Sequence, residues 1–144
     1  VQLQLNVLDD NPAILDLCDK YDLAALNRGP LAMGLLTGKY TAETKPSADD
    51  VRGVKSPEWM KYFKNGKPNP EWLTKRDAVP AILASDGRSM AQGALAWLWA
   101  RSPKTLPIPG FRTVAQVKEN AAAMQFDPLT MEQMREIDKV LERV

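Results

Sequence analysis

The sequence predicts an α/β fold with parallel strands that forms part of a larger sheet or barrel. Strand-like and helix-like segments alternate along the 144 residues, and this alternation is typical of parallel βα units. Only three strand candidates are present, which is too few for a parallel sheet with covered faces and protected edges. We therefore expect the sheet to be completed by residues outside this sequence.

The first 26 residues predict a strand, a helix and a second strand. Residues 1–5 alternate apolar and polar side chains, the period-two pattern of a strand with one polar face. Asn11 and Pro12 are a favourable cap and first turn for a helix. Its apolar stripe is predicted at Ile14, Leu17, Cys18 and Tyr21. The short apolar run at 23–26 predicts the second strand, which ends in the turn-rich NRGP.

Residues 27–70 predict a long loop rich in glycine, proline and charge. Connections of this length are unusual in compact domains and tend to be functional or mobile. A short helix is expected inside it at 57–64, with Trp59, Tyr62 and Phe63 on its apolar side. The loop is therefore a candidate part of a binding site.

The second half of the chain predicts helices on both sides of a third strand. A helical pattern begins near Glu71 and is expected to break near Pro80. Three capping boxes follow, each a Ser or Thr with a Gln three residues later, at Ser89, Thr113 and Thr130. They predict a helix after residue 89, one over 113–124 and an amphipathic terminal helix. Residues 105–108 are the third strand candidate.

The composition favours a single soluble domain and excludes several classes of function. The chain is 44% hydrophobic and 26% charged, with a net charge of +1 from 19 basic and 18 acidic residues. It lacks the broad basic field of a nucleic-acid binder and any apolar run long enough to span a bilayer. One cysteine and no secretory signal favour a cytoplasmic protein. The absence of histidine excludes serine–histidine and cysteine–histidine catalysis within the chain.

The glycine-rich stretch GPLAMGLLTGKY is the first candidate binding segment. Glycines let backbone N–H groups approach a phosphate, and Lys39 adds a positive charge. The stretch is not a P-loop, because the spacing from Gly34 to Gly38 is one residue short and Tyr40 replaces the magnesium-binding Ser or Thr. A flexible surface loop is an equally good interpretation.

The second candidate is PGFRTVAQVKEN, residues 109–120, where Arg112 precedes a capped helix start. The unpaired N–H groups and the positive dipole end of that helix favour a bound anion beside the guanidinium. Gln116, Glu119 and Asn120 share one side of the first turns and could contact the rest of a polar ligand. The alternative is an ordinary solvated helix face. Both candidate segments follow strand ends, where parallel α/β folds bind ligands.

Other conspicuous residues favour structural interpretations. Cys18 is expected in the core. Trp97 and Trp99 cannot share a helix face, so one is expected in the core and the other in a partner or edge contact. The pair Asp49 and Asp50 has no third metal ligand nearby and is expected to form a solvated turn.

Five segments together resemble the C-terminal half of an aldo-keto reductase. They are QLN after a strand, GPLAMGLLTGKY, AQGALAWLWA, PIPGFRTVAQVKEN and LTMEQMREID, in the family's order and over essentially all 144 residues. The resemblance implies a partial (β/α)8 TIM barrel, with strands six to eight and their helices in this chain. Residues 1–144 would then be the cofactor-binding portion, with the loop 27–70 over the cofactor and no bound metal.

The resemblance implies an NADP site and assigns residues to it. Gln4 would hold the nicotinamide carboxamide, and Arg52 would be a basic contact further along the loop. Gly29, Pro30, Leu31, Ala32, Gly34 and Lys39 would wrap the pyrophosphate. Gly110, Arg112 and Gln116 would contact the 2′-phosphate and ribose, and Glu119 and Asn120 the adenine.

The sequence departs from the family pattern at two points. Arg28 stands where the family usually has an aromatic ring stacked on the nicotinamide. The family's catalytic Asp, Tyr, Lys and His lie in the other half of the barrel, and Tyr21, Tyr40 and Tyr62 match none of those positions. The segment alone is therefore expected to be inactive.

The resemblance predicts an NADPH-dependent enzyme that reduces aldehydes or ketones to alcohols. Its partners would be a small carbonyl substrate and the missing N-terminal half of the same barrel. One alternative is a catalytically inactive NADP-binding sensor or regulatory subunit of reductase-like fold. Another is a truncated gene product with a structural role only.

Overall fold

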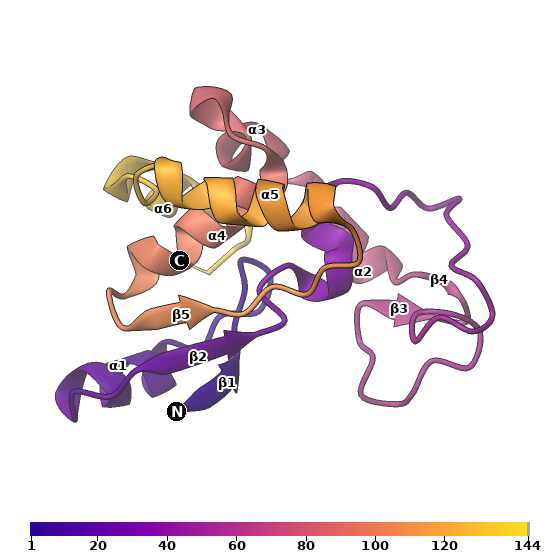
Figure 1. Cartoon of the computed structure of the whole chain (residues 1–144), viewed down its shortest axis with the longest axis horizontal. Helices are drawn as coiled ribbons and strands as arrows, with labels where there is room; N and C mark the ends of the chain where they lie inside the picture. The colour runs from indigo at the N-terminus through magenta and orange to yellow at the C-terminus, as the bar shows by residue number, and fades with distance from the viewer. Residues whose placement is uncertain (144) are drawn as a thin grey trace.

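A computed structural model, which describes residues 1–143, contains a three-stranded parallel sheet (Figure 1). The strands are β1 (Gln2–Gln4), β2 (Ala25–Arg28) and β5 (Thr105–Pro107), in the spatial order β1-β2-β5. The parallel α/β prediction is confirmed. The second strand begins two residues later than the apolar run suggested, because Leu23 and Ala24 connect the turn at Tyr21 and Asp22 to the strand, and the Leu23 N–H group donates to the Cys18 carbonyl of the preceding helix.

Helix α1 (Pro12–Lys20) follows β1 and begins at the predicted cap. The Asn11 side chain accepts a hydrogen bond from the Ile14 N–H group. The predicted apolar stripe is wrong in part, because Leu15 and Cys18 are buried whereas Leu17 and Tyr21 are exposed. Leu15 and Cys18 are three residues apart and therefore share a helix face. This buried face is rotated about the helix axis relative to the predicted face.

The segment after β2 contains a 3₁₀ helix and a hairpin rather than an open loop. The 3₁₀ helix η1 (Ala32–Thr37) comes first, and β3 (Phe63–Lys64) later pairs antiparallel with β4 (Lys67–Pro68). The predicted helix at 57–64 is therefore wrong. Asn65 and Gly66 both have positive φ, as a two-residue hairpin turn requires, and Trp59 is exposed. Residues 41–69 project as a lobe at one end of the molecule (Figure 1).

The remaining helices follow the predicted pattern. They are α2 (Pro70–Asp77), α3 (Pro80–Leu83), α4 (Met90–Arg101), α5 (Val114–Ala122) and α6 (Met131–Val140), with short 3₁₀ turns η2 (Ser85–Gly87) and η3 (Ala123–Gln125). The break before Pro80 is confirmed, and all three capping boxes are present. None of the helices within residues 1–143 is long and apolar enough to cross a membrane.

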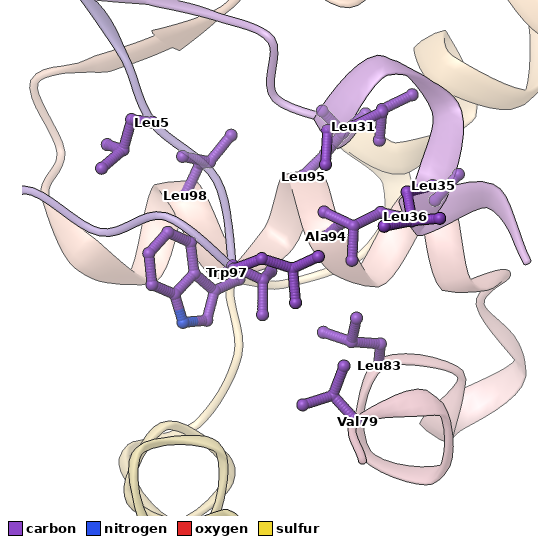
Figure 2. Close-up of a cluster of buried hydrophobic side chains, with 14 of the residues drawn as sticks. Leu5, Leu31, Leu35, Leu36, Val79, Leu83, Ala94, Leu95, Trp97 and Leu98 are labelled. Atoms are coloured by element: carbon purple, nitrogen blue, oxygen red, sulfur yellow. The ribbon is translucent and has the colours of Figure 1, made fainter. Parts of the chain in front are cut away.

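Helix α4 lies at the centre of the core. Figure 2 shows Ala94, Leu95, Trp97 and Leu98 of this helix among other buried side chains, which are Leu5 just after β1, Leu31 just before η1, Leu35 and Leu36 of η1, and Leu83 of α3. Trp97 is fully buried, as predicted for one of the pair, and Trp99 is half-buried against the core. Gly93 allows α4 to lie directly against α3, since a Cβ there would be 1.9 Å from the Leu83 carbonyl oxygen.

One face of the sheet carries exposed apolar side chains. Leu26 and Leu106 are opposite each other in β2 and β5, and they are 39% and 52% exposed. On the other face, Ala25 and Thr105 are buried, and the Thr105 hydroxyl donates to the Leu98 carbonyl of α4. β1 and β5 are the outer strands, and neither has a second neighbour among residues 1–143.

Candidate functional site

A cavity of about 490 Å³ lies where the segments after β2 and β5 meet. The strands are parallel, so these two segments leave the same end of the sheet. Eleven of the fourteen residues assigned by resemblance line this cavity: Gly29, Pro30, Leu31, Gly34, Lys39, Arg52, Gly110, Arg112, Gln116, Glu119 and Asn120. The structure thus brings both candidate segments to one site.

Three of the assigned residues do not line the cavity. Ala32 is fully buried inside η1 with φ +48°. Gln4 and Arg28 end β1 and β2, and the Arg28 guanidinium donates to the Gln4 side-chain oxygen at 3.3 Å. Both are close to the cavity, because Arg28 directly precedes Gly29.

The backbone of η1 at Gly34 allows the side chains of Tyr40 and Arg52 to come close to it. Met33 and Gly34 have positive φ, which interrupts the 3₁₀ helix. A Cβ on Gly34 would lie 3.1 Å from the Tyr40 ring and 3.3 Å from the Arg52 guanidinium. Positive φ is costly for residues other than glycine, and such strain clusters at ligand-binding sites. The conformation leaves room for Tyr40 and Arg52 to pack over η1.

Asp50 joins the two arginines of the cavity. The predicted turn is present and Asp49 is exposed in it, but a solvated position is wrong for the Asp50 side chain. Its carboxylate accepts from Arg52 Nε and Nη2, each at 2.7 Å, and from Arg112 Nη2 at 3.0 Å. Only 7% of the Asp50 side chain is exposed. The hydrogen bonds from Arg52 are the main cause that holds the Asp50 pKa well below its usual range. The carboxylate is therefore charged at neutral pH.

The N-terminus of α5 forms the other wall of the cavity. The Gln116 side-chain oxygen accepts from the backbone N–H groups of Arg112 and Thr113, and the Thr113 hydroxyl accepts from Gln116 N–H. The capping box leaves the N–H groups of Val114 and Ala115 for another acceptor. The Arg112 side chain is 70% exposed, so its guanidinium can reach a ligand there.

A second polar cluster fixes the side chain of Gln4. Its amide nitrogen donates to Asp9 Oδ2 at 2.8 Å and to the Tyr62 hydroxyl at 3.0 Å. Tyr62 also accepts from the Asn6 amide at 2.8 Å, and Lys61 pairs with Asp9. Burial is the main cause that raises the pKa of Tyr62 above its usual value. With both amide protons engaged, Gln4 presents only its carbonyl oxygen to a ligand.

The lining chemistry fits a phosphorylated nucleotide. Among the lining residues, Lys39, Arg52 and Arg112 supply three cations and Glu119 supplies one carboxylate, while the Asp50 carboxylate pairs with the two arginines. The α5 N-terminus adds a positive dipole end. No cluster of three or more His, Cys, Asp or Glu side chains within residues 1–143 could hold a metal ion.

Sequence reasoning missed several side chains of this region. Cavity residues that were not assigned are Met33, Thr37, Tyr40, Val51, Ala91 and Phe111. Tyr40 packs edge-on to Phe63 at 5.0 Å and lies 5.4 Å below the Arg52 guanidinium. The sequence did contain a signal for the contact between Asp50 and Arg52, because two residues of opposite charge at this spacing can form a local ion pair.

Comparisons with known proteins identify relatives of the chain. The model of the family described as "Aldo/keto reductase family" matches residues 1–142. The aldo-keto reductase yakc (NADP(+)) of Schizosaccharomyces pombe is 30% identical over 85% of this chain and 35% of its own length. The Oryza sativa protein named "Probable voltage-gated potassium channel subunit beta" is 31% identical over 88% of this chain and 37% of its own length.

A solved structure agrees with these matches. The glycerol dehydrogenase of Gluconobacter oxydans is 28% identical and superposes with a TM-score of 0.77, covering 99% of this chain and 42% of its own. The chain spans about a third of the length of the curated relatives it matches. The α/β fold therefore corresponds to part of the barrel of these relatives.

Proposed function

The chain belongs to the aldo/keto reductase family, and on this premise we propose that it is the NADP-holding part of an enzyme that reduces aldehydes or ketones to alcohols. It supplies strands six to eight of the barrel in this proposal, and the loop 27–70 lies over the cofactor. The catalytic tetrad comes from the rest of the barrel, since the chain has no histidine. Relatives named for NADP-dependent reduction support the cofactor assignment.

The observation that carries the proposal is the joining of two cationic segments at one cavity. Arg112 and the α5 N-terminus hold the 2′-phosphate, and Arg52 and Lys39 face the pyrophosphate near the backbone of 29–34. Glu119 and Asn120 contact the adenine. Gln4 accepts a hydrogen bond from the nicotinamide carboxamide at the second lone pair of its carbonyl oxygen, which also accepts from Arg28. NADPH supplies the hydride when it is bound.

The cofactor assignment is tested by measuring NADP and NAD affinities of the full-length protein by titration calorimetry. The variant Arg112→Ala is expected to lose roughly tenfold to hundredfold in NADP affinity, because a charge-assisted contact contributes about 1.5–3 kcal/mol. NAD affinity should change little. Arg135→Ala, an exposed arginine on α6, is the matched control. An Arg112→Ala protein that keeps its preference for NADP would show that the role of Arg112 is wrong.

A second candidate function is an NADP-binding regulatory subunit without turnover. It is favoured by the rice relative, whose name describes a channel subunit rather than a reductase. Both candidates use the same cofactor site, so binding does not separate them. Oxidation of NADPH by the full-length protein with a panel of aldehydes and ketones does, because a regulatory subunit leaves NADPH unchanged.

A further inference from the structure

We propose that Asp50 reduces the difference between the affinities for NADP and NAD, because its carboxylate is the partner of Arg112 whenever no 2′-phosphate is bound. The inference rests on the proposed NADP site and adds a residue to it that the family resemblance does not assign. It follows from three features of the structure: where the carboxylate sits, how firmly it is held and how exposed its second arginine is.

The Asp50 carboxylate is shared unequally between its two arginines. Both of its oxygens bind Arg52, and Oδ2 also accepts from Arg112 Nη2 at 3.0 Å. The side chains of Asp50 and Arg52 are only 7% and 14% exposed, whereas that of Arg112 is 70% exposed. Arg112 is therefore the partner that can leave.

Asp50 is held in place from the other side of the cavity. The Arg52 N–H group donates to Asp50 Oδ1 at 2.9 Å, and Arg52 Nη1 donates to the Met33 carbonyl at 3.0 Å. The Arg52 guanidinium also lies over the Tyr40 ring. These contacts tie Asp50 to η1, so the carboxylate stays at the cavity whichever dinucleotide binds.

A fixed carboxylate beside Arg112 affects the two cofactors in opposite ways. A 2′-phosphate must share Arg112 with Asp50 and lies near its negative charge, which weakens NADP binding. NAD lacks that phosphate. A site whose polar groups bind a phosphate normally binds a ligand without it poorly, because those groups then have no partner. Asp50 removes this penalty, since Arg112 keeps a carboxylate partner when NAD is bound.

The substitution Asp50→Asn tests the proposal in the full-length protein. It removes the charge and keeps the shape, so the ratio of NADP to NAD affinity should rise about fivefold at low salt, as expected for one partly exposed ion pair. The increase should shrink at high salt because exposed charges are screened. Asp49→Asn is the matched control, since it makes the same charge change at the exposed neighbouring position and should leave the ratio unchanged.

A double-mutant cycle separates this role from a structural one. In an Arg112→Ala background, Asp50→Asn should no longer raise the ratio, because the shared guanidinium is gone. Asp50→Glu keeps the charge and should stay near the wild-type ratio, which provides a second variant if Asp50→Asn folds poorly. The inference is overturned if the ratio of NADP to NAD affinity is unchanged or lower in Asp50→Asn. It is also overturned if this ratio rises in Asp50→Glu as it would in a neutral variant. A wild-type protein that binds neither NADP nor NAD overturns the proposed cofactor site instead.

Discussion

A single carboxylate, that of Asp50, links two segments that are 62 residues apart in the chain. Because it is charged and nearly buried between arginines, its ionisation contributes to the stability of the fold as well as to the charge of the cavity. The Arg52 hydrogen bonds lower its pKa in the folded state from an ordinary value of 3.8. A group of this kind stabilises the fold above its unfolded pKa and loses that effect as the pH falls.

We therefore predict that ionisation of Asp50 makes the free energy of unfolding depend on pH only under acidic conditions. The difference in free energy of unfolding between wild type and Asp50→Asn should be constant from pH 7 to pH 5. It should then fall as the pH drops below about 4 toward the lower folded-state pKa, because the folded protein resists protonation of Asp50. Urea unfolding at pH 7, 5 and 3 measures this. A difference that is the same at all three values contradicts the assignment of a lowered pKa.

At the scale of the elements, the close approach of α3 and α4 depends on Gly93. A Cβ at this position would overlap the Leu83 carbonyl, so the two helices must separate to accept any other residue. The contact lies in the middle of the core that Figure 2 shows around Ala94 and Leu95.

We predict that Gly93→Ala destabilises the protein by about 1–3 kcal/mol, although alanine favours a helix over glycine. Overpacking exceeds the gain in helix propensity, because the clash is with backbone atoms that cannot rotate away. Denaturant unfolding provides the measurement. Gly110→Ala serves as the control, because a Cβ there meets no atom within 4 Å. Equal stability of the two variants would mean that α3 moves freely.

Most elements of the fold could be predicted from local sequence rules, and the exceptions have physical causes. The capping boxes at Ser89, Thr113 and Thr130 are local, so they located three helices correctly. The hairpin at 63–68 was missed because aromatic side chains suggested a helix, although Asn65-Gly66 is a strong hairpin signal. The cavity lining followed from the family resemblance, whereas the position of Asp50 required knowledge of which segments meet in space.

At the scale of the whole molecule, the exposed apolar face of the sheet is the feature that a complete barrel would explain. Leu26 and Leu106 lie side by side on this face, and the outer strands β1 and β5 each pair on one edge only within residues 1–143. Exposed leucines on an open parallel sheet are unusual, since such sheets are normally covered on both faces.

We predict that Leu106→Lys destabilises the full-length protein by about 2 kcal/mol, because residues from the rest of the barrel bury this position. Met124→Lys, at a side chain that is 79% exposed on η3, should change stability little. Thermal unfolding of both variants provides the comparison. If Leu106→Lys is as stable as Met124→Lys, the face remains open in the full-length protein and the barrel proposal is wrong.

The buried thiol of Cys18 is a natural probe of local opening in this fold. The thiol is the only one in the 144 residues, and it is fully buried on the core-facing side of α1. A thiol reagent can reach it only when α1 separates from the core, so the labelling rate measures how often this local opening occurs. The same atom therefore packs the core and records its fluctuations without any engineered probe.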